Sequence, residues 1–281
     1  MRARVLAATI LIAAAALAGA TPARAGTVLS GLFSAPPAPK TITKDFSSAG
    51  IKTVSAQVAI GNISLHGVSG STIAAQISND EPSECDVTME VVGSELRIEA
   101  RGTNRWFWQA DRCRADITAG VPVGATVMAS AGEGDVNAAG LSGGASIHVG
   151  SGNVILKNVA GALAVRNGNG LVSGSVDSSQ IGAKVGNGSV DLTGLTGSAE
   201  VKVGNGNVRL AWAKAPKRGS VAVKTGRGDA VLEFPQGSEI QTSLTAGMGR
   251  VANEVGDAAG APFSVSAATG LGNITVKKAA P

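Results

Sequence analysis

Hydrophobic and polar residues alternate through most of this chain, in short runs that are separated by glycine. Each Gly-x-Gly pair is followed, two and four residues later, by positions that are mostly apolar, and another apolar position lies three residues before the pair. A period of two predicts short β-strands with one buried face. The three columns are Val136, Val154, Val172, Val190, Val208, Ala230, Val251 and Ile274; Ala138, Leu156, Gly174, Leu192, Leu210, Leu232, Asn253 and Val276; and Ile147, Val165, Ala183, Val201, Val223 and Leu244.

The Gly-x-Gly pair recurs at a nearly constant distance. Five copies recur at intervals of about 18 residues, and three more follow at intervals of about 21–23 residues. Such a period, with a turn in every copy, is typical of a solenoid in which each repeat is one coil stacked on the last. We therefore predict an all-β fold, a single-stranded parallel β-helix with about 18–23 residues per coil. The pairs are Gly132/Gly134, Gly150/Gly152, Gly168/Gly170, Gly186/Gly188, Gly204/Gly206, Gly226/Gly228, Gly247/Gly249 and Gly270/Gly272.

A coil of this length encloses a narrow lumen, which we expect small and β-branched side chains to fill. Aromatic residues make up only 3% of the chain, and tyrosine is absent. Glycine supplies the positive φ angle that the turn between the strands needs. Between the two glycines stand Asn169, Asn187 and Asn205 in three successive copies. These residues either form a hydrogen-bonded ladder along the stack or merely tolerate the left-handed turn conformation.

The segment Met1–Ala25 has the features of a secretory signal peptide. Arg2 and Arg4 precede an apolar run from Val5 to Leu17, and a small-x-small cleavage site ends at Ala25. We expect the mature chain to be exported, to the periplasm or the cell surface. The remainder has no apolar stretch approaching the roughly 20 residues that a spanning helix needs, so no transmembrane segment is expected after cleavage.

The formal charge of +4 comes mostly from this signal. Lys and Arg number 24 against 20 acidic residues, and removing Arg2, Arg4 and Arg24 leaves 21 against 20. A net charge near +1 gives no support for nucleic-acid binding. Residues 26–45, with three prolines, are expected to form a disordered linker.

The solenoid is expected to begin at residue 46, with N-terminal coils over 46–124 and regular repeats over 125–278. Within the first part, residues 85–100 form two alternating runs about a Gly-Ser turn, which predicts a hairpin inserted into the solenoid. Because an exported chain meets an oxidising compartment, Cys85 and Cys113 are predicted to form a disulfide. A loop of that size adds about 3–4 kcal/mol of stability in the chain-entropy account.

Three adjacent aromatic residues, Trp106, Phe107 and Trp108, follow the hairpin. They cannot all point inward from one strand. Either the rings shield an open end or flank of the solenoid, or they form a recognition patch for a sugar or a partner.

The order of these features resembles the bacterial putative-adhesin β-strand-repeat family, whose function is unknown. The resemblance runs from about residue 46 to 278 and rests on Gly61-Asn62-Ile63-Ser64-Leu65, on Glu95-Leu96-Arg97-Ile98, on the segment 116–124 and on the repeated Gly-Asn-Gly-x-Val. It implies a β-helix of the cell envelope, with an adhesin-like label. It supplies no catalytic residues.

Metal, phosphate and calcium chemistry find little support in the residues. His66 and His148 occupy different places in the repeat, which does not favour a paired imidazole site. The glycine pairs never extend to a phosphate-binding motif. A calcium repeat would need Asp at one column in every copy, and that column is mixed: Asp135, Asn153, Leu171, Ser189, Asn207, Asp229, Arg250 and Asn273. We expect no metal and no cofactor.

A polysaccharide lyase or hydrolase on a β-helix is the enzyme alternative. Such an enzyme needs acids from adjacent coils to converge on one groove. The acids of the repeat region fall in scattered columns, so we expect no catalytic residues. They are Glu133, Asp135, Asp177, Asp191, Glu200, Asp229 and Glu233.

One column of the repeat is basic. Two residues before the first glycine stand His148, Arg166, Lys184, Lys202 and Lys224. At about 4.8 Å per coil they would form a line roughly 19 Å long. The line is either a solubilising face or a contact surface for an anionic polymer such as lipopolysaccharide or teichoic acid, or for an acidic partner. We thus expect a non-enzymatic, adhesin-like envelope protein. An assembly module that pairs end to end through a final coil at Thr275–Val276 is a further alternative.

Overall fold

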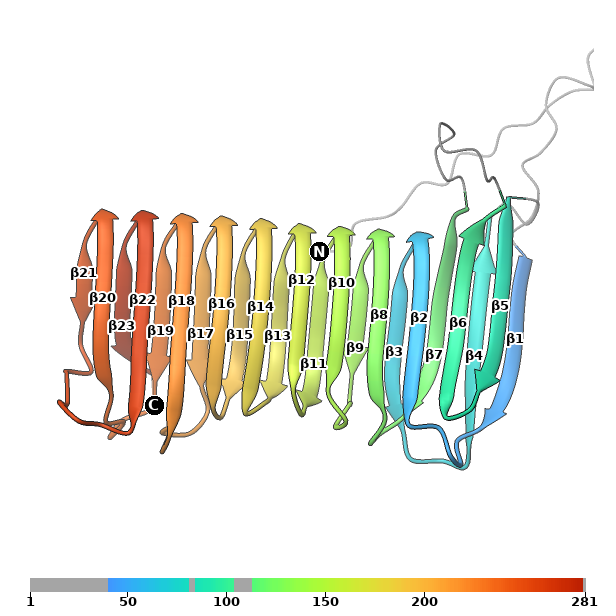
Figure 1. The fold of residues 1–281 in the computed structure, drawn as a ribbon, viewed down its shortest axis with the longest axis horizontal. Helices are drawn as coiled ribbons and strands as arrows, with labels where there is room; N and C mark the ends of the chain where they lie inside the picture. The colour runs from blue at the N-terminus through green and yellow to red at the C-terminus, as the bar shows by residue number, and fades with distance from the viewer. Residues whose placement is uncertain (1–39, 81–83, 104–112, 280–281) are drawn as a thin grey trace, which may run out of the picture. The chain divides into compact units, whose positions relative to one another are not determined.

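The structure, a computed structural model, describes residues 40–80, 84–103 and 113–279. All regular secondary structure in these segments is β-strand, arranged in two sheets that lie face to face (Figure 1). Most neighbouring strands within each sheet are parallel. The all-β prediction is therefore confirmed, and the arrangement is β-helix-like. The signal peptide and nearly all of the predicted linker lie outside the described residues.

The first sheet has 12 strands. In spatial order they are β1 (Lys40–Ser47), β4 (Thr72–Asn79), β7 (Ala115–Pro122), β3 (Ile63–Val68), β9 (Val136–Ala139), β11 (Val154–Ala160), β13 (Val172–Asp177), β15 (Val190–Leu195), β17 (Val208–Trp212), β19 (Ala230–Phe234), β23 (Ile274–Lys278) and β21 (Val251–Asn253).

The second sheet has 11 strands. Their spatial order is β20 (Gln241–Met248), β22 (Phe263–Leu271), β18 (Gly219–Arg227), β16 (Ser198–Asn205), β14 (Gln180–Asn187), β12 (Leu163–Asn169), β10 (Ala145–Ser151), β8 (Thr126–Glu133), β2 (Thr53–Ile60), β6 (Glu95–Gly102) and β5 (Cys85–Val92).

From β8 to β19 the chain alternates between the two sheets, and each pair of strands forms one coil. The register repeats the sequence period, because Val154 pairs with both Val136 and Val172, its counterparts in the preceding and following copies. The column residues Val136, Val154, Val172, Val190 and Val208 are at most 1% exposed and belong to one continuous core between the sheets. Alternating apolar positions therefore mark the inner face, as predicted.

The two glycines of each pair serve different purposes. The second glycine has a positive φ, for example 140° at Gly188, so it supplies the left-handed turn. The first glycine does not have a positive φ, but a Cβ atom at Gly186 would collide with the carbonyl oxygen of Gly168 in the neighbouring coil. Close stacking of the turns, as well as turn conformation, therefore selects glycine.

The residue between the glycines forms a hydrogen-bonded ladder. Asn187 Nδ2 donates to Asn169 Oδ1 at 3.0 Å, and Asn205 Nδ2 donates to Asn187 Oδ1 at 2.8 Å. Of the two interpretations of these asparagines, the structure supports the ladder. Stacked amides satisfy each other along the axis because identical residues recur at the same height in successive coils.

At the C-terminal end the coils do not stack in chain order. β22 and β23 pair with β18 and β19, while β20 and β21 lie outside them as the last coil in space. The column prediction is consequently wrong at Val251, which is 46% exposed, and at Asn253, because both belong to this outer coil. The final coil is also not at Thr275–Val276, since β23 has a strand on each side.

The N-terminal end departs from chain order as well. β6 and β7 form the coil outside β2 and β3, and the antiparallel strands β1, β4 and β5 complete the edges. The hairpin of β5 and β6 is confirmed, although β6 is part of the sheet rather than an insertion. The linker boundary at residue 45 is wrong, because strand β1 begins at Lys40.

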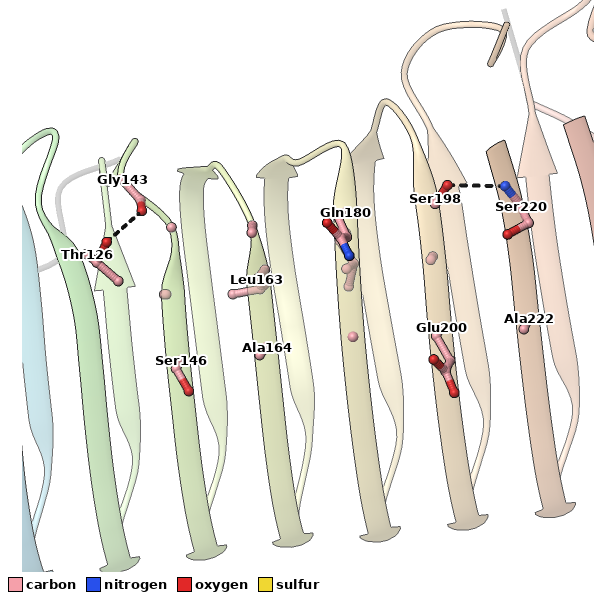
Figure 2. Close-up of a pocket in the computed structure, with 16 residues that line it drawn as sticks. Thr126, Gly143, Ser146, Leu163, Ala164, Gln180, Ser198, Glu200, Ser220 and Ala222 are labelled. Atoms are coloured by element: carbon pink, nitrogen blue, oxygen red, sulfur yellow. Dashed lines mark hydrogen bonds between the residues drawn. The ribbon is translucent and has the colours of Figure 1, made fainter. Parts of the chain in front are cut away.

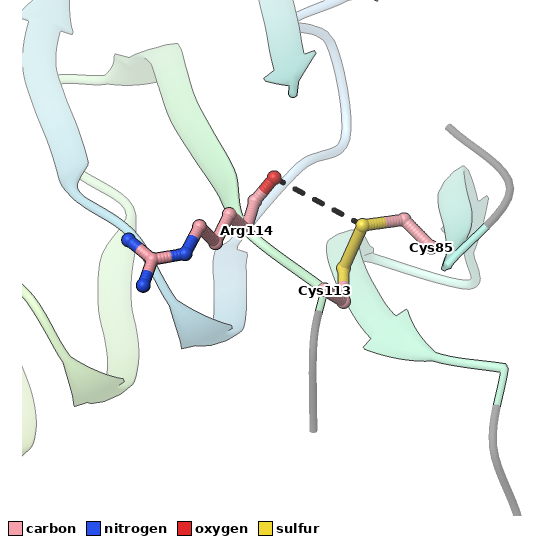
Figure 3. Close-up of a disulfide and its surroundings, with 3 residues drawn as sticks. All are labelled: Cys85, Cys113 and Arg114. Atoms are coloured by element: carbon pink, nitrogen blue, oxygen red, sulfur yellow. Dashed lines mark hydrogen bonds between the residues drawn. A yellow bond between two sulfur atoms is a disulfide. The ribbon is translucent and has the colours of Figure 1, made fainter. Parts of the chain in front are cut away.

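The predicted disulfide between Cys85 and Cys113 is present. It joins the start of edge strand β5 to the chain just before β7, with a Cα–Cα distance of 4.8 Å. Figure 3 shows it beside Arg114, whose carbonyl oxygen lies 3.9 Å from Cys85 Sγ. The bridge holds an edge strand of one sheet against the other sheet.

Aromatic rings fill the lumen where the repeat is longer, contrary to expectation. Trp212 stacks on Phe234 with ring centroids 4.5 Å apart, and Phe263 meets both rings edge-on. The indole Nε1 of Trp212 donates to the carbonyl of Gly197. These three large side chains are buried in the core of the longer coils.

Candidate ligand-binding face

The basic column lies in register on the outer face of the second sheet. His148 pairs with Arg166, Arg166 with Lys184, Lys184 with Lys202, and Lys202 with Lys224, on the parallel strands β10, β12, β14, β16 and β18. All five side chains are exposed because their neighbours along each strand point into the core. We call these five residues the basic ladder.

The basic ladder begins and ends abruptly. Its register neighbours are Ser130 on β8 and Ala268 on β22. Neighbouring strands are about 4.8 Å apart, well inside a Debye length of about 8 Å, so the charges of Arg166, Lys184, Lys202 and Lys224 repel one another and raise the local potential.

Glu200 provides partial compensation beside the ladder. Its carboxylate forms an ion pair with the ammonium group of Lys202. The hydrogen bond from Lys202, the charge of Lys202 and the more distant charge of Lys224 lower the pKa of Glu200. Both side chains are more than half exposed, so solvent screens this pair and it adds little stability.

A shallow groove of about 670 Å³ runs across the strands next to the ladder (Figure 2). Its floor is made of residues two positions before the ladder in each strand: Ser146, Ala164, Gly182, Glu200 and Ala222. On the side away from the ladder lie Thr126, Gln180, Ser198 and Ser220. A smaller hollow of about 220 Å³ joins the groove to Arg166, Lys184 and Lys202.

The small residues of this floor were not singled out from the sequence. Their signal was present, because alanine, glycine or serine recurs there at the period of the ladder in every copy but the one with Glu200. Small side chains lower the sheet surface next to the long basic side chains. The result is a trough that the smaller hollow borders on the side of Arg166, Lys184 and Lys202.

On the outer face of the first sheet, charged side chains form pairs of opposite sign. Arg209 forms ion pairs with Asp191 at 3.4 Å and with Glu233 at 3.1 Å, and Lys277 Nζ lies 3.2 Å from Glu233. Glu233 is 8% exposed, and the hydrogen bond from Arg209 lowers its pKa despite burial. The Glu233 carboxylate raises the pKa of Arg209. Opposite charges alternate across these coils, whereas the ladder stacks like charges.

The other predicted site residues do not join the ladder. His66 lies on β3 in the first sheet, so it is separate from His148. Trp106, Phe107 and Trp108 lie outside the described residues. Of the acids considered for catalysis, Asp191 and Glu233 are brought together by Arg209, and Glu200 lies in the groove.

Comparisons with known proteins give structural likeness only. No family model matches the chain, and no curated protein matches it. Similar solved structures include a putative adhesin from Bacteroides fragilis (15% identity, 84% of this chain and 97% of that one, TM-score 0.45). Two others are a putative adhesin from Parabacteroides merdae (13% identity, 86% and 97%, TM-score 0.42) and a putative cell adhesion protein from Clostridium sporogenes (12%, 86% and 100%, TM-score 0.33). At this level of identity, each is a similarity to a protein described as an adhesin or a cell adhesion protein.

The described residues contain no helix that is long and apolar enough to cross a membrane.

Proposed function

We propose that this chain is an exported, non-enzymatic envelope protein, a single-stranded β-helix that presents a rigid adhesin-like surface. The basic ladder binds an anionic polymer of the cell envelope, such as lipopolysaccharide or teichoic acid. The polymer lies along the groove, with its anionic groups against the ladder.

The observation that supports this proposal is the stacking of like charges in register. A parallel sheet places identical columns about 4.8 Å apart, so every basic residue added to the column increases repulsion in the free protein. The first sheet of the same molecule avoids this cost by alternating Asp191, Arg209 and Glu233. A bound polyanion relieves the repulsion on the second sheet and gains charge-assisted contacts.

The groove favours a linear ligand over a globular one. It extends from Thr126 on β8 to Ala222 on β18, with hydroxyl and amide groups along one side, and the smaller hollow at Arg166, Lys184 and Lys202 adjoins it on the other. Such an arrangement contacts both the charges and the hydroxyl groups of a glycan. A globular acidic protein could contact the basic ladder, but its surface would not fill the narrow floor of the groove.

Glycan cleavage is less well supported. Glu200 is the single acid lining the groove among the described residues, and its pKa is lowered. A general acid needs the opposite shift, and both glycosidase mechanisms need a second carboxyl group nearby.

Binding of the purified protein to lipopolysaccharide and to lipoteichoic acid, measured over a series of salt concentrations, tests the proposal. The variant Arg166→Gln, Lys184→Gln, Lys202→Gln, Lys224→Gln should bind at least about tenfold more weakly, since close charge pairs at an interface contribute strongly. Affinity should also fall as salt rises, because screening weakens the attraction. The melting temperature should stay the same or rise slightly.

A matched control is available at exposed positions away from the ladder. Lys214→Gln, Lys217→Gln, Arg218→Gln, Lys278→Gln removes the same number of lysines and arginines. It should retain most of the affinity. An equal loss of affinity in both variants would mean that net charge alone attracts the polymer. No loss of affinity in the ladder variant would mean that the ladder is only a solvent-exposed face and not a binding surface.

A further inference from the structure

We infer that the outermost C-terminal coil, formed by β20 and β21, is a self-complementary edge through which two copies of the protein join tail to tail. The inference does not depend on the proposed ligand. It begins from the strand order, which leaves β20 and β21 each with a hydrogen-bonded strand neighbour on one side only.

The two ends of the described fold differ in charge. The edge strands β1 and β5 carry Lys40, Lys44, Asp45, Asp86 and Glu90, whereas β20 and β21 carry no charged residue and no proline. Charges on an edge strand, above all inward-pointing ones, prevent pairing with another strand. Lys44 is inward-pointing, because it pairs with buried Ala75, and its Nζ reaches the carbonyl of Met89 at 3.2 Å. Charged residues thus protect the edge strands at the N-terminal end, whereas β20 and β21 themselves carry no such protection.

Apolar side chains are exposed at the same corner of this coil. Leu271 and Met248 continue the column of the asparagine ladder, and they are 36% and 68% exposed. Val251 follows just after the turn and is 46% exposed. A column that is polar through the middle of the stack therefore becomes apolar over its last two coils. Contiguous exposed apolar residues mark interaction surfaces.

The opposite corner of the same coil has a hollow. A space of about 240 Å³ lies there, lined by both apolar and polar residues: Ser238, Glu239, Ile240, Val255, Gly256, Asp257 and Ala258. The loop after β21 closes this half of the edge, where Asp257 accepts a hydrogen bond from the backbone N–H of Thr242 and Ala258 N–H donates to the carbonyl of Ile240. The edge therefore has a projecting Met248 at one end of β20 and a hollow at the other.

A two-fold axis through the middle of the edge makes these features complementary. Antiparallel pairing of two β21 strands about Ala252 brings Arg250 of each copy opposite Glu254 of the other. The same axis brings each Met248 toward the other copy's hollow at Ile240 and Val255. Isologous contacts of this kind are the commonest in homo-oligomers. Head-to-tail contacts would instead bury Lys44 and Asp45 against strands that carry no charged residue, which is costly.

Sedimentation equilibrium of the purified protein over a range of concentrations tests the inference. We expect the mass of two copies. Met248→Glu should shift the mass to one copy, and Arg250→Glu or Glu254→Arg should weaken association by about tenfold or more, since each puts like charges opposite one another. The double variant Arg250→Glu, Glu254→Arg should restore the dimer, because reversal of both charges recreates the pair across the axis.

The control is Val91→Glu, Val92→Glu at the other end, where both side chains are 45% exposed. It should leave the dimer intact. All substituted residues are exposed, so melting temperatures should be unchanged and confirm folding. A single-copy mass of the parent at every concentration, loss of the dimer in the control, or failure of the charge swap to restore it would each overturn the inference.

Discussion

At the scale of single residues, adjacent positions at the start of a strand differ in how deeply their side chains are buried. Val190 is 1% exposed and packs between Val172 and Val208 in neighbouring coils. Ser189, one residue earlier, is half-buried at the turn, and its Oγ accepts a hydrogen bond from the backbone N–H of Asn207. The same substitution should therefore destabilise the protein at Val190 and have little effect at Ser189.

Val190→Asp should lower the free energy of unfolding by about 4 kcal/mol, because it buries an unpaired carboxylate. Ser189→Asp should be nearly neutral, since Asp135 and Asp229 occupy the same column and accept the equivalent bonds. Urea unfolding of both variants checks the pair. If Val190→Asp unfolded like the parent, the assignment of the inner face would be wrong.

Glu233 gives the stability a pH dependence. Its pKa is lowered in the folded protein from the ordinary 4.5, first by the hydrogen bond from Arg209. A lowered pKa means that its contribution is fully present above about 4.5 and is lost as pH falls through the folded value. The stability difference between the parent and Glu233→Gln should therefore be largest near neutral pH and shrink in acid.

Glu200→Gln serves as the control for this titration. The pKa of Glu200 is lowered as well, but its side chain is 61% exposed against 11% for Glu233. Solvent screening should leave its variant close to the parent at all pH values. If the stability difference between the parent and Glu233→Gln did not change with pH, the ion pairs of Glu233 with Arg209 and Lys277 would not be the cause of that difference.

At the scale of the elements, polar groups close both ends of the lumen. Lys44 reaches across from β1 to Met89 on β5 at one end. At the other end Asn253 Nδ2 donates to Thr242 Oγ1, which links β21 to β20 across the core. Repeat proteins need terminal units with a polar surface, since the stacking otherwise continues without limit. Here the polar atoms lie at inward positions of the outermost strands.

The disulfide secures the edge strand β5. Peptide mapping without reduction should recover Cys85 linked to Cys113, and Cys85→Ala, Cys113→Ala should lose about 3.5 kcal/mol of stability for a loop of 28 residues. Alkylation of both thiols in the untreated native protein would contradict the bridge. Unchanged stability of the double variant would show that the reduced chain already holds β5 in place.

At the scale of the whole described molecule, the two ends share one topological device. At each end, the order of two coils in space differs from their order in the sequence. β6 and β7 follow β2 and β3 in the sequence but lie outside them, between them and the N-terminal end of the stack. β20 and β21 precede β22 and β23 in the sequence but lie outside them at the other end. The outermost coils are therefore not the first and last of the repeats in sequence. The side chains at one end protect the edge strands from pairing with another chain. Those at the other end, as we infer, allow two copies of the protein to associate.

The repeat and its inner face were determined by the sequence alone. A strict period leaves one register for parallel pairing, and a slip of one position would turn Val154 or Val172 out of the core. The basic ladder could be predicted from the same period. When the repeats stack in register, residues at the same position of successive repeats form a line on the surface. Likewise Cys85 and Cys113 could be paired because the chain has only two cysteines.

Only the tertiary structure decided which coil stacks on which at the ends, and hence that Val251 and Asn253 are at the boundary. The repeats at Gly249 and Gly272 carry almost the same local signals, so either could pair with the coil of Gly228. The choice depends on long-range packing, including Phe263 against Trp212 and Phe234, which no local pattern encodes. The groove floor and the charge network around Glu233 likewise became visible once strands distant in sequence lay side by side.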